Sequence, residues 1–213
     1  PYSIRMQQVI GNLARKADVS SAPKLLVGNG KEKIHLLVIV SADRGLCGGF
    51  NGTITRQTRA EVARLQADNK TVKLLMVGRK SADSLRREFG DLYIDQREGL
   101  QGTSVSYADS SAIAEVIRVG FESGEFDVCT LIFNKFKNAI TQELTLTRLI
   151  PAEVENGYDE NNDKASISYE YEPEEDELLA SLLPRNLSTQ LYSALLESSA
   201  AELAARMTAT VSY

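Results

Sequence analysis

IHLLVIVSADRGLCGGFN, at residues 34–51, decides the fold, because it joins an apolar run to a glycine-rich loop and the start of a helix. The apolar run at 34–40 is typical of a strand buried on both faces of a parallel sheet. From Phe50 onward, apolar residues at helical spacing predict a helix over residues 50–67. The stretch therefore predicts a strand, a tight loop and a helix, which form one unit of an α/β fold.

Strand and helix patterns continue to alternate downstream of this unit. The expected strands lie at 72–77, 92–94 and 128–133, and the expected helices at 81–89 and 108–121. This order predicts right-handed crossovers and an α/β fold with an open, mostly parallel, Rossmann-like sheet and flanking helices.

Two later segments alternate polar and apolar side chains. Residues 143–150 do so, which indicates an antiparallel or edge strand reached by a hairpin. Ile167, Tyr169 and Tyr171 alternate similarly. We therefore expect the parallel sheet to end in antiparallel pairing.

Both ends of the chain predict helices with apolar stripes. Residues 1–17 carry one such stripe, and the pattern from Glu174 onward is helical, with Pro184 expected to kink or restart the helix. A near-heptad row of mostly small side chains in the C-terminal helix is formed by Leu191, Ala194, Ser198, Ala201 and Ala205. Because we expect too little sheet to cover both stripes, the two helices are predicted to pair as an antiparallel coiled coil, with this row as its seam.

These patterns predict an α/β globular domain at residues 24–172, between terminal helices at 1–22 and 173–213. The chain has 213 residues, 43% of them hydrophobic and 25% charged, which is ordinary globular composition. Cys47 and Cys129 are too few for a disulfide scaffold, and the single histidine, His35, cannot form a metal pair. We expect no metal site and no cofactor.

Charge is concentrated in one segment of the chain. The net charge is −5, yet residues 151–181 hold eleven acidic residues and only one basic residue, Lys164. A basic body with one acidic arm argues against a nucleic-acid-binding protein. The acidic segment is either a solvated loop and helix start, or a docking surface for a basic partner.

The glycine-rich loop lies where doubly wound folds bind phosphates. The spacing does not fit, because Cys47 stands where the dinucleotide-binding fingerprint needs its second glycine counted from Gly45, and no Gly-Lys-Ser/Thr ending follows. We favour a tight turn in which Asp43 or Asn51 satisfies free backbone N–H groups. The alternative is a Rossmann-type nucleotide-binding enzyme that uses residues 45–49. A thiol near a helix start can also have a lowered pKa, but no base can be assigned to Cys47.

Three segments in the correct order resemble the gamma subunit of F-type ATP synthases. SADRGLCGGFN at 41–51 closely resembles the family stretch SSDRGLCGGLN. ESSAAELAARMTA at 197–209 is similar to a second family block, and YEYEP at 169–173 to the start of the family's C-terminal helix. The signature residues that the resemblance marks are Asp43, Arg44, Gly45, Leu46, Cys47, Gly48 and Gly49.

The resemblance implies a non-catalytic rotor that couples proton flow to ATP synthesis. It implies an α/β foot on a ring of membrane c subunits, beside the epsilon subunit, and a coiled coil that turns inside a hexamer of alpha and beta subunits. The implied location is peripheral, on the cytoplasmic face of a bacterial inner membrane or the matrix face of a mitochondrial one. Both helices are expected to be truncated relative to the family.

The resemblance also implies a contact with the c ring near the start of the C-terminal helix. The residues expected at this contact are Tyr171, Glu172, Glu174, Glu175, Asp176 and Arg185.

Overall fold

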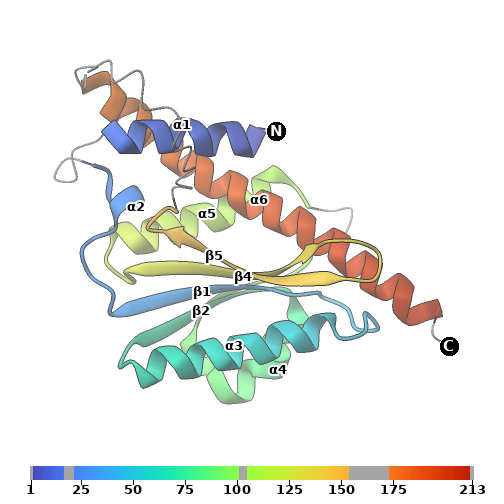
Figure 1. Ribbon diagram of the computed structural model, residues 1–213. Coiled ribbons are helices and arrows are strands. Elements are labelled where there is room, and N and C mark those ends of the chain that lie inside the picture. Colours follow the sequence, from blue (N-terminus) through green and yellow to red (C-terminus); the bar gives the residue numbers. More distant parts are fainter. Residues whose placement is uncertain (1, 17–21, 101–104, 154–172, 212–213) are drawn as a thin grey trace.

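A five-stranded sheet lies at the centre of the computed structural model, which describes residues 2–16, 22–100, 105–153 and 173–211 (Figure 1). The sheet order is β3-β2-β1-β4-β5. Its strands are β1 (Ile34–Val40), β2 (Thr71–Val77), β3 (Tyr93–Arg97), β4 (Val128–Phe136) and β5 (Gln142–Ile150). The first four are parallel and β5 pairs antiparallel with β4, so the predicted open, mostly parallel sheet is confirmed.

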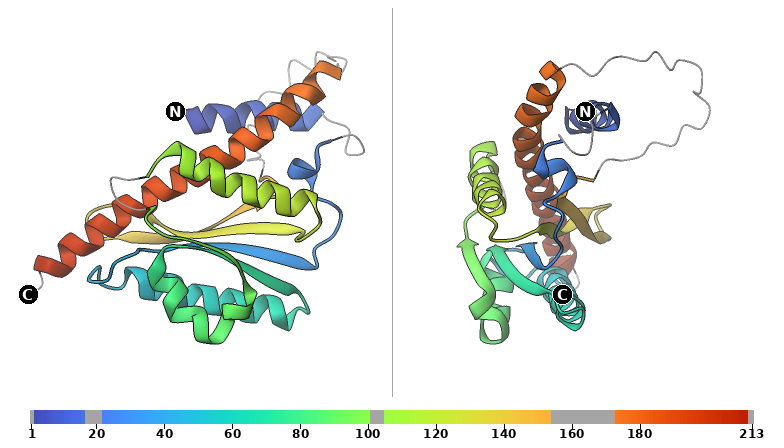
Figure 2. Two further views of the ribbon diagram at one scale, coloured as in Figure 1. Left: turned by 180° about the vertical axis from the view of Figure 1, so that it is seen from behind. Right: turned by 90° about the vertical axis from the view of Figure 1, so that its left-hand side faces the viewer.

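Helices cover both faces of the sheet (Figure 2). The helices of the described residues, with one 3₁₀ turn among them, are α1 (Tyr2–Lys16), α2 (Lys24–Val27), α3 (Phe50–Ala67), α4 (Arg79–Phe89), η1 (Gly90–Leu92), α5 (Tyr107–Glu122) and α6 (Pro173–Val211). Leu36 and Val38 of β1 pack towards α5 and α6, whereas Leu37 and Ile39 pack towards α3 and α4. This alternation explains why β1 reads as a continuous apolar run, since both of its faces are buried.

The predicted elements differ from the observed ones mainly at their ends. β3 extends to Arg97, and α4 begins at Arg79 rather than at residue 81. Pro184 lies inside one continuous helix, so the alternative of a restarted helix is wrong. The alternation at Ile167, Tyr169 and Tyr171 lies outside the described residues.

α6 contacts three separate apolar clusters along its length. Leu179 and Leu183 pack with Met6 and Ile10 of α1. Further along, α6 joins the cluster between the sheet and α5, and then the cluster on the α3 side. Figure 1 shows α1 and α6 running in opposite directions, as predicted, and α1 lies along α6 from Leu179 to about Leu196.

The five residues predicted as a seam against the N-terminal helix face the sheet instead, which corrects that prediction. Leu191 and Ala194 pack beside α5 and β4, and Ala201 and Ala205 pack against residues of α3 and its preceding loop. Ser198 is fully buried between these two groups along the helix. The cause is that the sheet faces extend beyond α5 and α3 and cover this stripe, so the premise of too little sheet was wrong.

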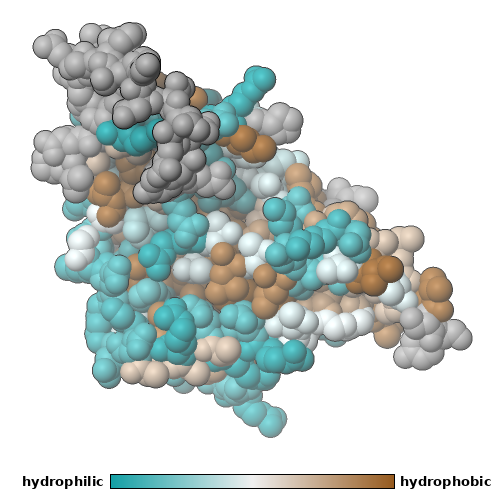
Figure 3. Space-filling view, in the orientation of Figure 1, coloured by the Kyte–Doolittle hydropathy of each residue, from teal (hydrophilic) through white to brown (hydrophobic). Residues whose placement is uncertain are grey.

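A second stripe on α6 remains open in its place. We call Leu196, Leu203, Met207 and Val211 the open stripe; Leu203 is 51% exposed and Met207 71% exposed. Figure 3 shows hydrophobic side chains gathered towards this end of the molecule. In the sequence this stripe is marked by a large apolar residue at every one or two helical turns, whereas the near-heptad row of mostly small residues marks the buried side of the same helix.

Candidate functional site: the junction of the signature loop and α6

The signature loop, residues 43–49, is held in place by the side chain of its own aspartate. Asp43 accepts the backbone N–H of Arg79 through Oδ1 at 3.0 Å and that of Gly99 through Oδ2 at 2.8 Å. The carboxylate therefore joins the loop to the start of α4 and to the segment after β3. An anion would have to compete with this carboxylate for the N–H group at the start of α4.

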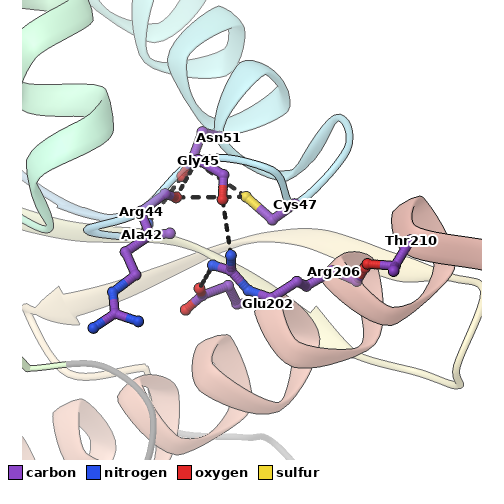
Figure 4. Close-up of polar contacts among 8 residues, drawn as sticks. All are labelled: Ala42, Arg44, Gly45, Cys47, Asn51, Glu202, Arg206 and Thr210. Carbon is purple, nitrogen blue, oxygen red and sulfur yellow. Dashed lines mark hydrogen bonds and ion pairs between the residues drawn. The ribbon is translucent and has the colours of Figure 1, made fainter.

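Asn51 closes the loop from its other end (Figure 4). Its Oδ1 accepts the Ala42 N–H at 2.9 Å, and its Nδ2 donates to the Arg44 carbonyl oxygen at 3.3 Å and to the Cys47 sulfur at 3.2 Å. The predicted role of Asp43 and Asn51 in satisfying backbone N–H groups is confirmed. The turn also needs left-handed backbone at Leu46 and Gly48, with φ values of 60° and 55°.

Arg206 of α6 reaches into the loop from across the domain. Its Nη1 donates to the Gly45 carbonyl oxygen at 2.9 Å, while its other guanidinium nitrogen pairs with the Glu202 carboxylate one turn earlier. Figure 4 shows the guanidinium pointing from α6 to the loop between these two acceptors. Since a charged donor strengthens a hydrogen bond, this contact joins residues 161 positions apart by a strong, directional bond.

Cys47 is buried beneath this contact. Its thiol is packed in the same cluster as Phe50, Ala201 and Ala205. Burial raises the pKa of the Cys47 thiol, the Glu202 carboxylate raises it further, and Arg206 opposes them. A buried, protonated thiol is a poor nucleophile, so the geometry does not support a reactive Cys47. Cys129 is also buried, and burial raises its pKa strongly.

The hairpin between β4 and β5 contacts α6 on its other side. Thr208 Oγ1 lies 3.0 Å from the Ala139 carbonyl oxygen and 2.9 Å from the Ala204 carbonyl oxygen one turn earlier in α6, so its single proton is shared between these two acceptors. The Phe136 N–H donates to a Glu197 carboxylate oxygen at 3.2 Å. The C-terminal segment of α6, residues 197–211, is therefore bonded to two different loops of the α/β body, which consists of β1–β5 and α2–α5.

The residues predicted to contact a membrane ring are only partly described. Tyr171 and Glu172 lie outside the described residues, and Glu174 belongs to α6 without a described side chain. Glu175 and Asp176 are half-buried, and each already interacts with another group. Arg185 is exposed and lines a cavity of about 620 Å³ with Tyr2 of α1, Tyr107 of α5 and Tyr192 of α6.

Within the described ranges, no group of three or more histidine, cysteine or acidic side chains is placed to hold a metal ion. Among the helices in those ranges, none is both long enough and apolar enough to cross a bilayer.

A mostly parallel α/β domain whose glycine-rich loop is bonded to a long terminal helix defines the class: an α/β body that carries a helical stalk. The family described as ATP synthase matches residues 1–212. The ATP synthase gamma chain of Paramagnetospirillum magneticum is 46% identical over 210 residues, which are 98% of this chain and 71% of that one. The chain belongs to the ATP synthase gamma-chain family.

Other relatives and solved structures agree with this assignment. The gamma chain of Acidiphilium cryptum is also 46% identical, over 98% of this chain and 72% of its own. A central-stalk and c-ring structure of the Tetrahymena thermophila mitochondrial ATP synthase contains a chain with a TM-score of 0.65 and 25% identity, covering 100% of this chain and 99% of that chain. A rotor structure from Euglena gracilis, with a TM-score of 0.60 at 15% identity, shares the fold over 99% of this chain and 81% of that chain. As a gamma chain, the protein is a non-catalytic subunit of the ATP synthase complex.

Proposed function

We propose that the chain is the central-stalk rotor subunit of an F-type ATP synthase, which couples proton flow through a membrane ring to ATP synthesis at other subunits. Family membership over nearly the whole chain carries this proposal. The partners we propose are the alpha, beta, epsilon and c subunits. The location we propose is peripheral, on the cytoplasmic face of a bacterial inner membrane, in keeping with the bacterial relatives; the mitochondrial matrix face is the alternative.

The geometry of the signature loop disfavours the nucleotide-binding alternative. Asp43 already occupies the N–H group at the start of α4, and the Gly45 carbonyl already accepts from Arg206. The loop also lacks the Gly-Lys-Ser/Thr ending of a P-loop and the glycine spacing of a dinucleotide site, and it contributes the Asp43 carboxylate, which would repel a phosphate.

Copurification tests the proposed function. A tagged subunit that carries this chain should copurify from its own cells with alpha, beta, epsilon and c subunits, and the complex should pump protons when it is given ATP. Recovery of the chain alone, with saturable nucleotide binding that Gly48→Val abolishes, would support the alternative instead.

We propose that the open stripe of α6 is the seam for the second helix of the stalk. α1 already reaches the beginning of this stripe, since Tyr2 and Ser3 line one cavity with Tyr192 and Leu196. The resemblance implies a longer helix beside α6, which would bury the exposed Leu203 and Met207 side chains. Their burial would stabilise the pairing by roughly 1.5–3 kcal/mol for each large apolar side chain.

We also propose that the acidic start of α6 aligns the subunit on the membrane ring. Exposed ion pairs contribute only about 0–1 kcal/mol each, so these charges would steer assembly rather than hold it. Replacing Glu174, Glu175 and Asp176 with Lys should weaken ring assembly. The effect should be larger at low salt, because salt screens exposed charges.

A control with the same change in net charge separates steering at this site from a general charge effect. Asp68→Lys, Asp91→Lys and Glu98→Lys alter exposed positions away from α6. If both triple variants assemble equally well at low salt, the acidic start of α6 is only a solvated surface.

A further inference from the structure

The C-terminal segment of α6 meets the α/β body through side chains that are too small to prevent rotation by shape alone. Ala201 and Ala205 are buried there against Cys47 and Phe50. Alanines let two surfaces approach closely, but they offer no knob that blocks a helix from turning about its own axis. Leu191 and Leu195 pack against the body earlier in the helix, so within this C-terminal segment the resistance to turning must come from directional contacts on the sides of the helix.

Two sets of directional contacts lie on opposite flanks of this segment. Glu197 and Thr208 bond the hairpin tip, and Arg206 bonds the signature loop. At 3.6 residues per turn, Arg206 lies about 180° around the helix from Glu197, whereas Thr208 lies within about 20° of Glu197. Turning the helix in either direction would stretch the bonds of one flank.

Both acceptors on the body are themselves fixed. The Gly45 carbonyl belongs to a loop that Asp43 and Asn51 join to three neighbouring segments. On the other flank, Asn138 Oδ1 accepts the N–H groups of Ile140 at 3.0 Å and Thr141 at 2.9 Å, which orders the hairpin tip around the Ala139 carbonyl. Each loop leads directly into the central sheet, through β1 in one case and through β4 and β5 in the other.

We infer that Arg206 and Thr208 are positioning residues that fix the rotational angle of α6 on the α/β body, so that torque passes between stalk and body at this two-sided clamp. The torque role rests on the proposed rotor function, whereas the clamp itself can be tested in the chain alone.

The two native cysteines provide the first readout. Cys47 is buried under the Arg206 flank, and Cys129 is buried on β4. Arg206→Gln should speed alkylation of Cys47 at least ~10-fold and leave Cys129 unchanged, because losing a charge-assisted bond of about 1.5–3 kcal/mol favours local opening by that factor or more. Arg64→Gln, which removes an exposed arginine that pairs with Glu61 within α3, is the matched control.

Each flank has a substitution that keeps the proposal testable if a stronger variant fails to fold. Arg206→Lys keeps a positive charge near Glu202 but lacks the second guanidinium nitrogen that donates to the Gly45 carbonyl oxygen. This variant should therefore also expose Cys47. Thr208→Val keeps the side-chain shape and removes the hydroxyl that bonds Ala139 in the hairpin and Ala204 within α6, so it should speed hydrogen exchange at the hairpin tip. Thr210→Val is its control, since the Thr210 hydroxyl donates to the Arg206 carbonyl within α6.

The second readout uses the assembled complex reconstituted into vesicles. The double variant Arg206→Gln with Thr208→Val should lose most proton-driven ATP synthesis while ATP hydrolysis persists, and Arg64→Gln with Thr210→Val should behave as wild type. Unchanged Cys47 alkylation in Arg206→Gln and Arg206→Lys would overturn the clamp. Fast alkylation with wild-type synthesis would overturn its torque role and leave the rotor function intact. If even the control complex does not assemble, the proposed function fails, while the alkylation result still decides the clamp.

Discussion

At the scale of single residues, buried carboxylates organise the loops by accepting backbone N–H groups. Asp127, just before β4, accepts Asn29 Nδ2 at 2.8 Å through one oxygen, and the N–H groups of Lys33 at 3.0 Å and Ile34 at 2.9 Å through the other. Burial alone would raise the pKa of Asp127, but these hydrogen bonds outweigh it and lower the pKa. The ionised carboxylate therefore fixes the segment that enters β1.

The lowered pKa of Asp127 predicts a pH-dependent contribution to stability. Its folded pKa lies below the value of about 3.9 for an unfolded chain, so the stabilisation is present above about pH 4 and is lost as pH falls through the folded pKa. Asp127→Asn should lower the free energy of unfolding by about 1–3 kcal/mol at pH 7. The difference from wild type should shrink in urea titrations as the pH falls below about 4. A difference that is independent of pH, or equal to that of the exposed control Asp68→Asn, would contradict this role.

Gly78 and Gly30 both have left-handed backbone, but only at Gly78 would an added side chain also collide with a neighbouring segment. A Cβ atom at Gly78 (φ 101°) would lie 2.0 Å from the Ser41 carbonyl oxygen, whereas at Gly30 (φ 79°) nothing lies within 4 Å. Gly78→Ala should therefore lower the free energy of unfolding by at least ~2 kcal/mol more than Gly30→Ala does, because it adds a clash with the Ser41 backbone to the same kind of conformational strain. Thermal or urea unfolding of both variants checks this difference. Equal losses would show that the backbone around Ser41 can move away.

At the scale of elements, the sequence was most informative where both faces of a strand are buried. β1, β2 and β4 were located within a residue or two at their starts, because continuous apolar runs flanked by turn residues leave few alternatives. β3 was expected to be short, since only part of it is apolar. The two faces of α6 were harder to distinguish, because a helix that contacts three clusters carries apolar residues on more than one side.

The corrected orientation of α6 gives a matched pair of substitutions. Leu191 is 1% exposed and packs against the sheet and α5, whereas Leu203 is 51% exposed on the open stripe. In the chain alone, Leu191→Ala should lower the free energy of unfolding by about 2–5 kcal/mol, and Leu203→Ala by less than about 0.5 kcal/mol. Urea unfolding measures both. A larger loss for Leu203 would restore the original assignment, in which the row containing Leu191 forms the coiled-coil seam.

Only the contacts between residues that are close in sequence could be predicted for the candidate site. Asp43 and Asn51 are close in sequence to the backbone groups that the turn exposes, so a role for them in the loop followed from turn chemistry. The bond from Arg206 to Gly45 spans 161 residues, and no local pattern encodes such a pairing. The glycines of the loop likewise read as a phosphate site or a tight turn until the helix that packs on them is placed.

At the scale of the whole molecule, α6 contributes to all three apolar clusters of the described chain. It packs with α1 at its start, with the sheet and α5 in its middle, and with the signature loop and the hairpin towards its end. One continuous helix bonded to the body at several points is suited to transmit rotation, because twisting it must also turn the sheet. This arrangement is what the proposed rotor function requires of a central stalk.

Rotation inside an immobilised hexamer of alpha and beta subunits tests this account most directly. Both native cysteines are buried, so Asp68→Cys at the exposed end of α3 provides a selective attachment point for a visible probe. The account predicts that the probe turns stepwise in one direction when ATP is added and stops when ATP is removed. A hexamer that assembles with this subunit and hydrolyses ATP while the probe remains stationary would contradict it.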